Sequence, residues 1–152
     1  MKLRGVMLTG ALLGAACAAQ AGPAYVGPCD FAARADNIVE PWSENTATFA
    51  NGAVRLALMD TIEPAAAAFH ILVLSPPYDE VGGRQCRVIS AAKDTGFGGV
   101  DFAALSASYD PATGLSLMLP VSTYDGTGDA MSHQLRMTLN QATGAIATEV
   151  AP

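Results

Sequence analysis

Hydrophobic and polar residues alternate along most of this chain, which is the pattern of half-buried β-strands. The clearest segment is 115–121, where every second residue is a large aliphatic one, and the segments 53–58 and 134–139 repeat this pattern. Successive side chains of a strand point to opposite faces, so each segment has one apolar face. The apolar positions are Val54, Leu56, Leu58, Leu115, Leu117, Leu119, Val121, Leu135, Met137 and Leu139. These segments predict antiparallel strands that cover a core with one face.

Turn residues separate these segments at short distances. Asn51-Gly52 lies between the predicted strands 46–49 and 53–58, and both residues tolerate the positive φ of a tight hairpin turn. The sequences 110–114 and 140–144 share the form D/N-x-A-T-G, in which Asp or Asn bonds the turn backbone and glycine takes the left-handed conformation. We expect these turns to join 104–109 to 115–121, and 134–139 to 145–150.

Two more strands are predicted in the first half. Segment 67–74 is apolar on both faces, which indicates a central strand covered on both sides, and Pro76-Pro77 is expected to end it. Segment 85–91 is the next strand, and 95–99 and 124–129 are expected to be loops. The predicted fold class is all-β: a single antiparallel β-sandwich or small barrel of about seven to eight strands.

The beginning of the chain departs from this pattern. Residues 22–28 are expected to be a flexible lead-in. Residues 30–38 are expected to form a short N-terminal helix, because Asp30 can cap it and Phe31, Ala35 and Ile38 recur at helical spacing. Pro41 is expected to end this helix.

Residues 1–21 have the features of an export signal. Lys2 and Arg4 precede an apolar stretch, 6–16, and Ala19-Gln20-Ala21 is a small-x-small cleavage site. We therefore expect a mature protein of residues 22–152 that forms a single secreted β domain. Its expected location is the periplasm or the exterior of the cell. A lipid anchor at Cys17 is the alternative. It is disfavoured because such sites usually have Leu three residues earlier, where this chain has Gly14.

Two cysteines, Cys29 and Cys86, remain after cleavage at that site. An even pair in an oxidising compartment usually forms a disulfide. The two residues are far apart in sequence and lack the C-x-x-C spacing of a redox-active pair. We therefore expect a structural disulfide between them.

The charge balance argues against some partners. Without Lys2 and Arg4, six basic residues stand against 14 acidic ones, a net charge of −8. The basic residues form no run in sequence, whereas nucleic acids and anionic membranes are bound by clustered Lys and Arg. We expect no nucleic-acid partner, and no apolar stretch is long enough to predict a membrane span.

No sequence motif predicts catalysis, a metal or a cofactor. His70 and His133 lack the close spacing of zinc ligands, so His70 is expected to be a packed or edge histidine and His133 an exposed one. The loop 125–129 lacks the full pattern of a calcium loop. No G-x-S-x-G is present, and strands do not alternate with helices as that hydrolase fold requires. We expect no catalytic residue, no metal, no cofactor and no enzymatic activity.

The segment 76–80 is the predicted partner-binding loop: Pro76, Pro77, Tyr78, Asp79 and Glu80. Two prolines stiffen the backbone before an aromatic residue and two acids, which lowers the entropic cost of binding. The hypothesis is a secreted or periplasmic non-catalytic binding domain whose partner is another periplasmic or extracellular protein. The alternatives are an inhibitor of a secreted hydrolase, such as a lysozyme or a protease, and a small periplasmic enzyme. A pocket lined by His70 and carboxylates would favour the enzyme.

Overall fold

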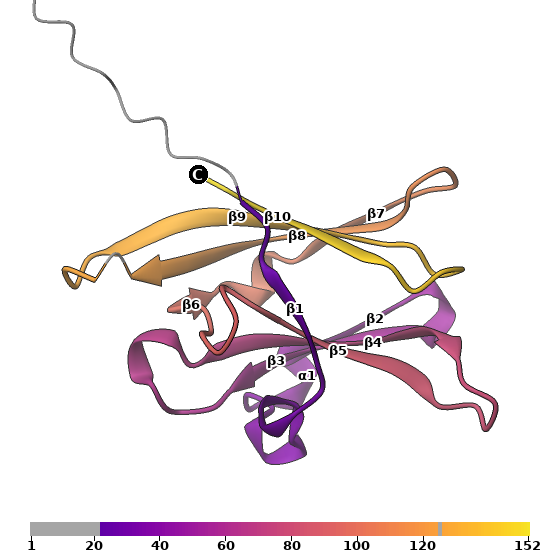
Figure 1. Cartoon of the computed structure of the whole chain (residues 1–152), viewed down its shortest axis with the longest axis horizontal. Helices are drawn as coiled ribbons and strands as arrows, with labels where there is room; N and C mark the ends of the chain where they lie inside the picture. Colours follow the sequence, from indigo (N-terminus) through magenta and orange to yellow (C-terminus); the bar gives the residue numbers. More distant parts are fainter. Residues whose placement is uncertain (1–21, 125) are drawn as a thin grey trace, which may run out of the picture.

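The computed structural model describes residues 22–124 and 126–152, which form two antiparallel β-sheets, one above the other in Figure 1. The first sheet has the order β1-β5-β4-β3-β2, and the second has the order β10-β9-β8-β6, with β7 also paired to β8. The strands are β1 (Tyr25–Pro28), β2 (Thr46–Phe49), β3 (Val54–Asp60), β4 (Phe69–Tyr78), β5 (Arg84–Ser90), β6 (Gly99–Val100), β7 (Ser106–Asp110), β8 (Gly114–Tyr124), β9 (Ala130–Leu139) and β10 (Ile146–Ala151). The predicted all-β sandwich is confirmed, with ten strands in place of the seven or eight expected.

The two additional strands are β1 and β6. The expectation of a flexible lead-in is wrong, because β1 pairs with β5 from Tyr25↔Ser90 to Pro28↔Arg87. β6 pairs with Val121 and Ser122 of β8, and its first residue, Gly99, is the last residue of the segment 95–99 expected to be a loop. Both strands are too short to show an alternating pattern. Their pairing depends on distant partners rather than on local sequence.

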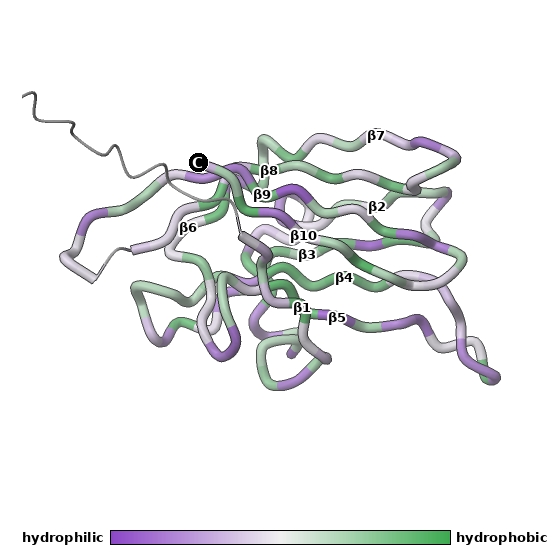
Figure 2. Tube along the Cα trace, turned by 45° about the horizontal axis from the view of Figure 1, so that its top comes forward, coloured by the Kyte–Doolittle hydropathy of each residue, from purple (hydrophilic) through white to green (hydrophobic). Residues whose placement is uncertain are grey.

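The predicted apolar faces meet between the two sheets and form the core. All ten aliphatic positions named from the sequence are buried, and Ile71, Val73, Ile89 and Phe97 join them. β4 is central in its sheet, as expected. In Figure 2 hydrophobic stretches follow the paired strands, and hydrophilic residues lie in several connections and also along β5 and β9.

The three predicted turns are present. Asn51 and Gly52 have φ values of 54° and 86° between β2 and β3. In the turn after β7, Asp110 Oδ1 accepts hydrogen bonds from the backbone N–H of Ala112 at 2.7 Å and of Thr113 at 3.2 Å. Asn140 accepts the equivalent pair, at 3.0 and 3.1 Å. Gly114 and Gly144 have φ values of 104° and 75°, as the turn chemistry predicted.

The prediction that Pro76-Pro77 ends the central strand is wrong. β4 continues to Tyr78, and the pairing with β5 shifts register between Ser75 and Tyr78. Neither proline has a partner in this register, so their missing N–H groups break no ladder hydrogen bond. The strand thus carries both prolines in an irregularity and then resumes.

The single helix expected over 30–38 is also not formed. Two 3₁₀ turns, Phe31–Ala33 and Ala35–Asn37, are separated by Arg34 in an extended conformation. Asp30 does cap the first turn, since its Oδ1 accepts from Ala32 N–H at 3.0 Å. Ile38 then pairs with Met59 of β3, which requires extended backbone. Pro41 precedes α1 (Trp42–Asn45), which is the one α-helix of the described residues, and does not end a helix.

The predicted export signal and Cys17 lie outside the described residues. Within 22–124 and 126–152, no helix has the length and hydrophobicity needed to cross a bilayer.

Candidate functional site

The predicted binding loop forms the end of β4 and the tip of the β4–β5 hairpin. In Figure 1 this hairpin extends beyond the other strands of its sheet, at the lower right. Ser75 before it is buried and Pro76 is half-buried, whereas Pro77, Asp79 and Glu80 are exposed. Tyr78 is 50% exposed, and the neighbouring Val81 is 92% exposed. The loop therefore presents two large apolar side chains to solvent.

Contacts with other parts of the chain hold the base of this hairpin. Arg84 donates a hydrogen bond to the backbone oxygen of Gly52 at 3.1 Å. Gln85 Nε2 donates to the backbone oxygen of Gly144, in the turn between β9 and β10 of the other sheet, at 2.8 Å and to Ser75 Oγ at 3.3 Å. A Cβ atom at Gly144 would lie 2.5 Å from Pro77 Cδ, so the turn after β9 packs directly against the diproline.

Asp79 closes the hairpin turn. Its Oδ1 accepts hydrogen bonds from the backbone N–H groups of Val81 at 3.0 Å and Gly83 at 2.6 Å. The backbone N–H of Asp79 also donates to the oxygen of Gly83 at 2.8 Å. Asp79 thus orders the tip, and Glu80 is the acid of this segment that has no part in the turn hydrogen bonds.

The predicted disulfide between Cys29 and Cys86 is present, with a Cα–Cα distance of 5.6 Å. It joins the residue after β1 to β5. This bond fixes the segment that carries Asp30 and Phe31 to the first sheet.

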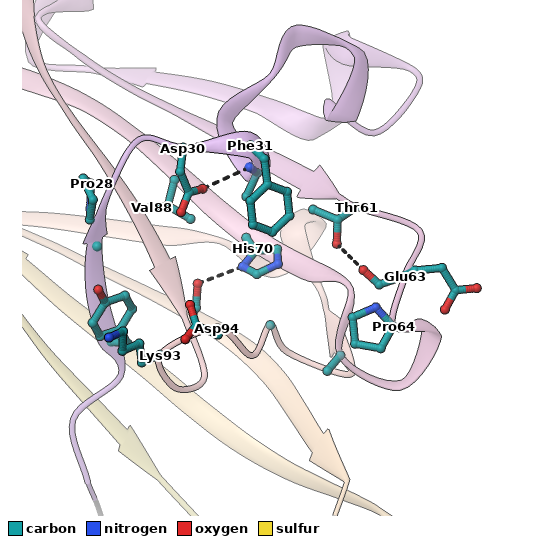
Figure 3. Close-up of a pocket in the computed structure, with 16 residues that line it drawn as sticks. Pro28, Asp30, Phe31, Thr61, Glu63, Pro64, His70, Val88, Lys93 and Asp94 are labelled. Atoms are coloured by element: carbon teal, nitrogen blue, oxygen red, sulfur yellow. Dashed lines mark hydrogen bonds between the residues drawn. The ribbon is translucent and has the colours of Figure 1, made fainter.

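A cavity of about 230 Å³ lies beside this disulfide, at the opposite end of β4 from the hairpin tip. Its walls come from β1, the first 3₁₀ turn, the loop after β3, the start of β4, the end of β5 and the loop after β5 (Figure 3). The side chains that line it include His70, Ser90, Asp30, Glu63, Lys93, Asp94, Tyr25 and Phe31. Residues far apart in sequence therefore meet here.

His70 lies on the wall of this cavity and is 7% exposed. Its Nδ1 is 2.8 Å from Ser90 Oγ, and Ser90 is 5% exposed. Burial lowers the pKa of His70, and the charges of Asp30 and Asp60 oppose that shift. The imidazole is therefore neutral at neutral pH. The expectation that His70 is a packed histidine is confirmed. The strand pattern did not indicate that His70 also lines a cavity.

Two backbone positions beside the cavity have unusual conformations. Ile62, next to the lining residues Thr61 and Glu63, has a φ of 69° and is 74% exposed. Asp94 has a φ of 62°. A β-branched residue is strained at positive φ, and such strain often occurs at ligand sites.

The other histidine differs from its prediction. His133 is half-buried rather than exposed, and its Nε2 is 3.0 Å from Thr123 Oγ1. It therefore belongs to the β8–β9 pair. Within 22–124 and 126–152, no group of three or more His, Cys, Asp or Glu residues is arranged to hold a metal ion. Asp125 of the weak calcium candidate lies outside that part.

Sequence reasoning named His70 but did not connect it with Ser90, Asp30 or Asp94. No spacing signals this group, because its members come from two strands, the start of a 3₁₀ turn and the loop after β5. Comparisons with protein-family models, with curated proteins and with solved structures find no match to this chain.

Proposed function

We propose that this protein is an exported, non-catalytic binding domain that presents the β4–β5 hairpin to a partner protein. The observation that carries this proposal is the contrast between the two ends of the hairpin. Its base is held by Gln85 and Arg84, whereas its tip exposes Tyr78 and Val81. Exposed apolar side chains on an ordered projection are typical of contact sites between proteins.

The ordered tip reduces the cost of binding. Asp79 fixes the turn through two backbone N–H groups, and Pro77 packs against Gly144. Because little backbone freedom is left to lose on association, more of the contact energy of Tyr78 appears as affinity. Tyr78 also offers a large rigid ring with a polar end.

The charge of the protein favours a basic partner. Residues 22–152 carry a net charge of −8, and Glu80 is exposed at the hairpin tip. Opposite charges on the partner raise the association rate at low ionic strength. Higher salt should therefore slow association more than it speeds dissociation.

Export to the periplasm or the exterior is part of this proposal. The disulfide between Cys29 and Cys86 supports it, because such bonds persist in oxidising compartments. The basic start of the chain, its apolar stretch and its small-x-small motif support it independently.

Among binding domains, the projecting hairpin supports an inhibitor of a secreted hydrolase. A hairpin with an exposed aromatic residue has the shape to enter an enzyme's substrate cleft. Inhibition of a lysozyme or a protease by the purified protein, lost in Tyr78→Ala, is the result expected of such an inhibitor.

The cavity is the observation that favours an enzyme instead, because His70 and three carboxylates line it. The geometry offers less support for catalysis than for binding. A nucleophile and its base are normally oriented by a third group, but His70 bonds only Ser90 among the described residues, and that hydroxyl is almost fully buried. We therefore favour binding.

Capture of partners from the exported fraction of the producing cell tests the proposal. The tagged wild-type protein is compared with Tyr78→Ala and with Tyr109→Ala, a matched loss of an exposed tyrosine on β7 of the other sheet. We expect a partner retained by wild type and Tyr109→Ala and lost by Tyr78→Ala, with all three proteins folded by circular dichroism. Retention by Tyr78→Ala would show that the hairpin is not the contact site.

A further inference from the structure

The cavity beside the disulfide holds a polar atom that the fold does not use. His70 forms one hydrogen bond, from Nδ1 to Ser90. Its other ring nitrogen, Nε2, has no hydrogen-bond partner among the described residues. Every fully buried side-chain nitrogen or oxygen in that part of the chain does have a partner, so Nε2 is not fully buried. Because His70 lines the cavity, Nε2 reaches the cavity space. In Figure 3 this second ring nitrogen lies on the side of Thr61 and Pro64.

The hydrogen bond at Nδ1 decides whether Nε2 carries the ring proton. Ser90 Oγ has no other hydrogen-bond partner among the described residues. If Nδ1 carried the proton, the buried hydroxyl hydrogen of Ser90 would have no acceptor, which costs free energy. Ser90 therefore donates to Nδ1, and Nε2–H of His70 donates into the cavity. A ligand there needs a hydrogen-bond acceptor.

The rest of the lining is acidic and aromatic. Asp30, Glu63 and Asp94 stand against Lys93, and the neutral His70 adds no charge. In Figure 3 the Glu63 carboxylate points away from His70, which leaves Asp30 and Asp94 as the other acids of the lining, and the charge of Asp30 acts on His70. Phe31 is 66% exposed on the same cavity, and an aromatic face attracts a cation. This combination favours a positively charged ligand.

We infer that this cavity binds a small amine cation that also carries a carbonyl or hydroxyl oxygen. The oxygen accepts from Nε2–H of His70, and the ammonium group is stabilised by Asp30, Asp94 and the face of Phe31. Amino-acid amides and amino alcohols have this chemistry. The cavity of about 230 Å³ is below the roughly 300–1,000 Å³ of sites for drug-sized ligands, so the ligand is small.

This site is distinct from the hairpin of the proposed function. His70 and Tyr78 are eight residues apart on one strand, which corresponds to roughly 26 Å along an extended chain. Loss of partner capture through Tyr78 and loss of amine binding at His70 can therefore be observed separately.

Nitrogen NMR of the purified, disulfide-bonded protein tests the inference directly. Long-range ¹H–¹⁵N spectra of the histidine side chains report which ring nitrogen of His70 carries the proton. We expect Nε2. Titration with glycinamide, which has an ammonium group and a carbonyl, should give saturable shifts of the His70 ring in the millimolar range. Ethylamine lacks the acceptor and acetamide lacks the charge, so each should bind at least about threefold more weakly.

Asp30→Asn is the variant that separates charge from folding. The Asn side-chain oxygen still accepts from Ala32 N–H, so the 3₁₀ turn keeps its cap. Asp110→Asn is the matched control, because Asn140 already has the same role in the equivalent turn. We expect Asp30→Asn to weaken glycinamide binding about threefold to tenfold and Asp110→Asn to change it less than about twofold.

Three results would overturn the inference. They are a proton on Nδ1 of His70, the absence of saturable shifts with glycinamide, and an affinity for ethylamine or acetamide equal to that for glycinamide. Equal weakening by Asp30→Asn and Asp110→Asn would also contradict it, because the effect would then come from net charge alone.

Discussion

The side chain of Gln85 joins the two sheets, because its Nε2 donates a hydrogen bond of 2.8 Å to the backbone oxygen of Gly144. Gln85 lies on β5, and Gly144 lies in the turn between β9 and β10, 59 residues further along the chain. Gly144 is buried at this contact and packs against Pro77. The base of the β4–β5 hairpin and one D/N-x-A-T-G turn therefore support each other.

Replacement of Gln85 by Ala should lower the free energy of unfolding by about 1–2 kcal/mol, because the carbonyl of Gly144 loses its donor at a buried position. Urea unfolding followed by circular dichroism measures this. Gln134→Ala, at an exposed position of β9, is the control and should have little effect. Equal losses in the two variants would contradict a stabilising contact between the sheets.

Gly144→Val should destabilise the protein much more than Ala145→Val. The positive φ of Gly144 alone costs a β-branched residue about 1–3 kcal/mol. The new Cβ would also lie 2.5 Å from Pro77 Cδ, whereas Ala145 is exposed. Thermal unfolding of the two variants provides the comparison. The turn assignment fails if Ala145→Val has the lower melting temperature.

Cys86→Ala should lower the melting temperature markedly. The disulfide spans 57 residues, and closing a loop of that length restricts the unfolded chain by about 4 kcal/mol. Wild type under reducing conditions is expected to resemble the variant. Alkylation of both Cys29 and Cys86 in the native, unreduced protein would show that the bond does not form in solution.

Stability should fall as the pH is lowered below His70's ordinary pKa. Burial lowers the pKa of His70 from 6.5 in the folded protein, so the unfolded chain takes up its proton first. The stabilising contribution of the neutral ring is complete above about pH 6.5 and decreases as the pH falls toward the folded-state pKa. Asp30, Asp60, Glu63, Asp94 and Lys93 are the charged groups around this ring.

Urea unfolding at several values between about pH 5 and pH 7.5 measures that dependence, in a range where most carboxylates stay ionised. We expect a weaker pH dependence in His70→Gln than in wild type. His133→Gln is the control, since Gln can still bond Thr123. An unchanged pH dependence in His70→Gln would contradict the role given to burial.

We predict that export removes residues 1–21, so that the mature protein begins at or close to Gly22 and carries no lipid. The small-x-small sequence that ends at Ala21 is the reason. N-terminal sequencing and intact mass measure both properties. The mass of a lipid on Cys17 would contradict this prediction.

The sequence predicts most of the sheet structure because both of its signals are local. The alternation of Leu115, Leu117 and Leu119 depends only on the strand period, and the turn at Asn140 depends only on its own amide and the glycine that follows. β1 and β6 could not be found in this way. Each is held by pairing with residues far away in sequence, and neither has an alternating pattern of its own.

The cavity lies beyond sequence reasoning for a related reason. His70 lies near the start of β4 and Ser90 at the end of β5, each beside apolar residues. This local sequence alone indicates that both side chains pack in the core. The disulfide and the β1–β5 pairing bring Asp30 to them, and Asp94 lies in the loop that follows Ser90 at the end of β5. Residues 76–78 of the predicted binding loop belong to β4, and only Asp79 and Glu80 lie in the turn, where the hydrogen bonds of Asp79 were not predicted.

The strand order has a consequence for how the chain folds. β2 to β5 and β7 to β10 are two runs in which each strand pairs with the next one in sequence. Contacts between sequence neighbours form quickly, so each run can become ordered without the other. β1 is different, because its partner β5 follows β2, β3 and β4 in the chain. Since synthesis starts at the N-terminus, β1 is made first and cannot pair until β5, the last strand of its sheet, has been made.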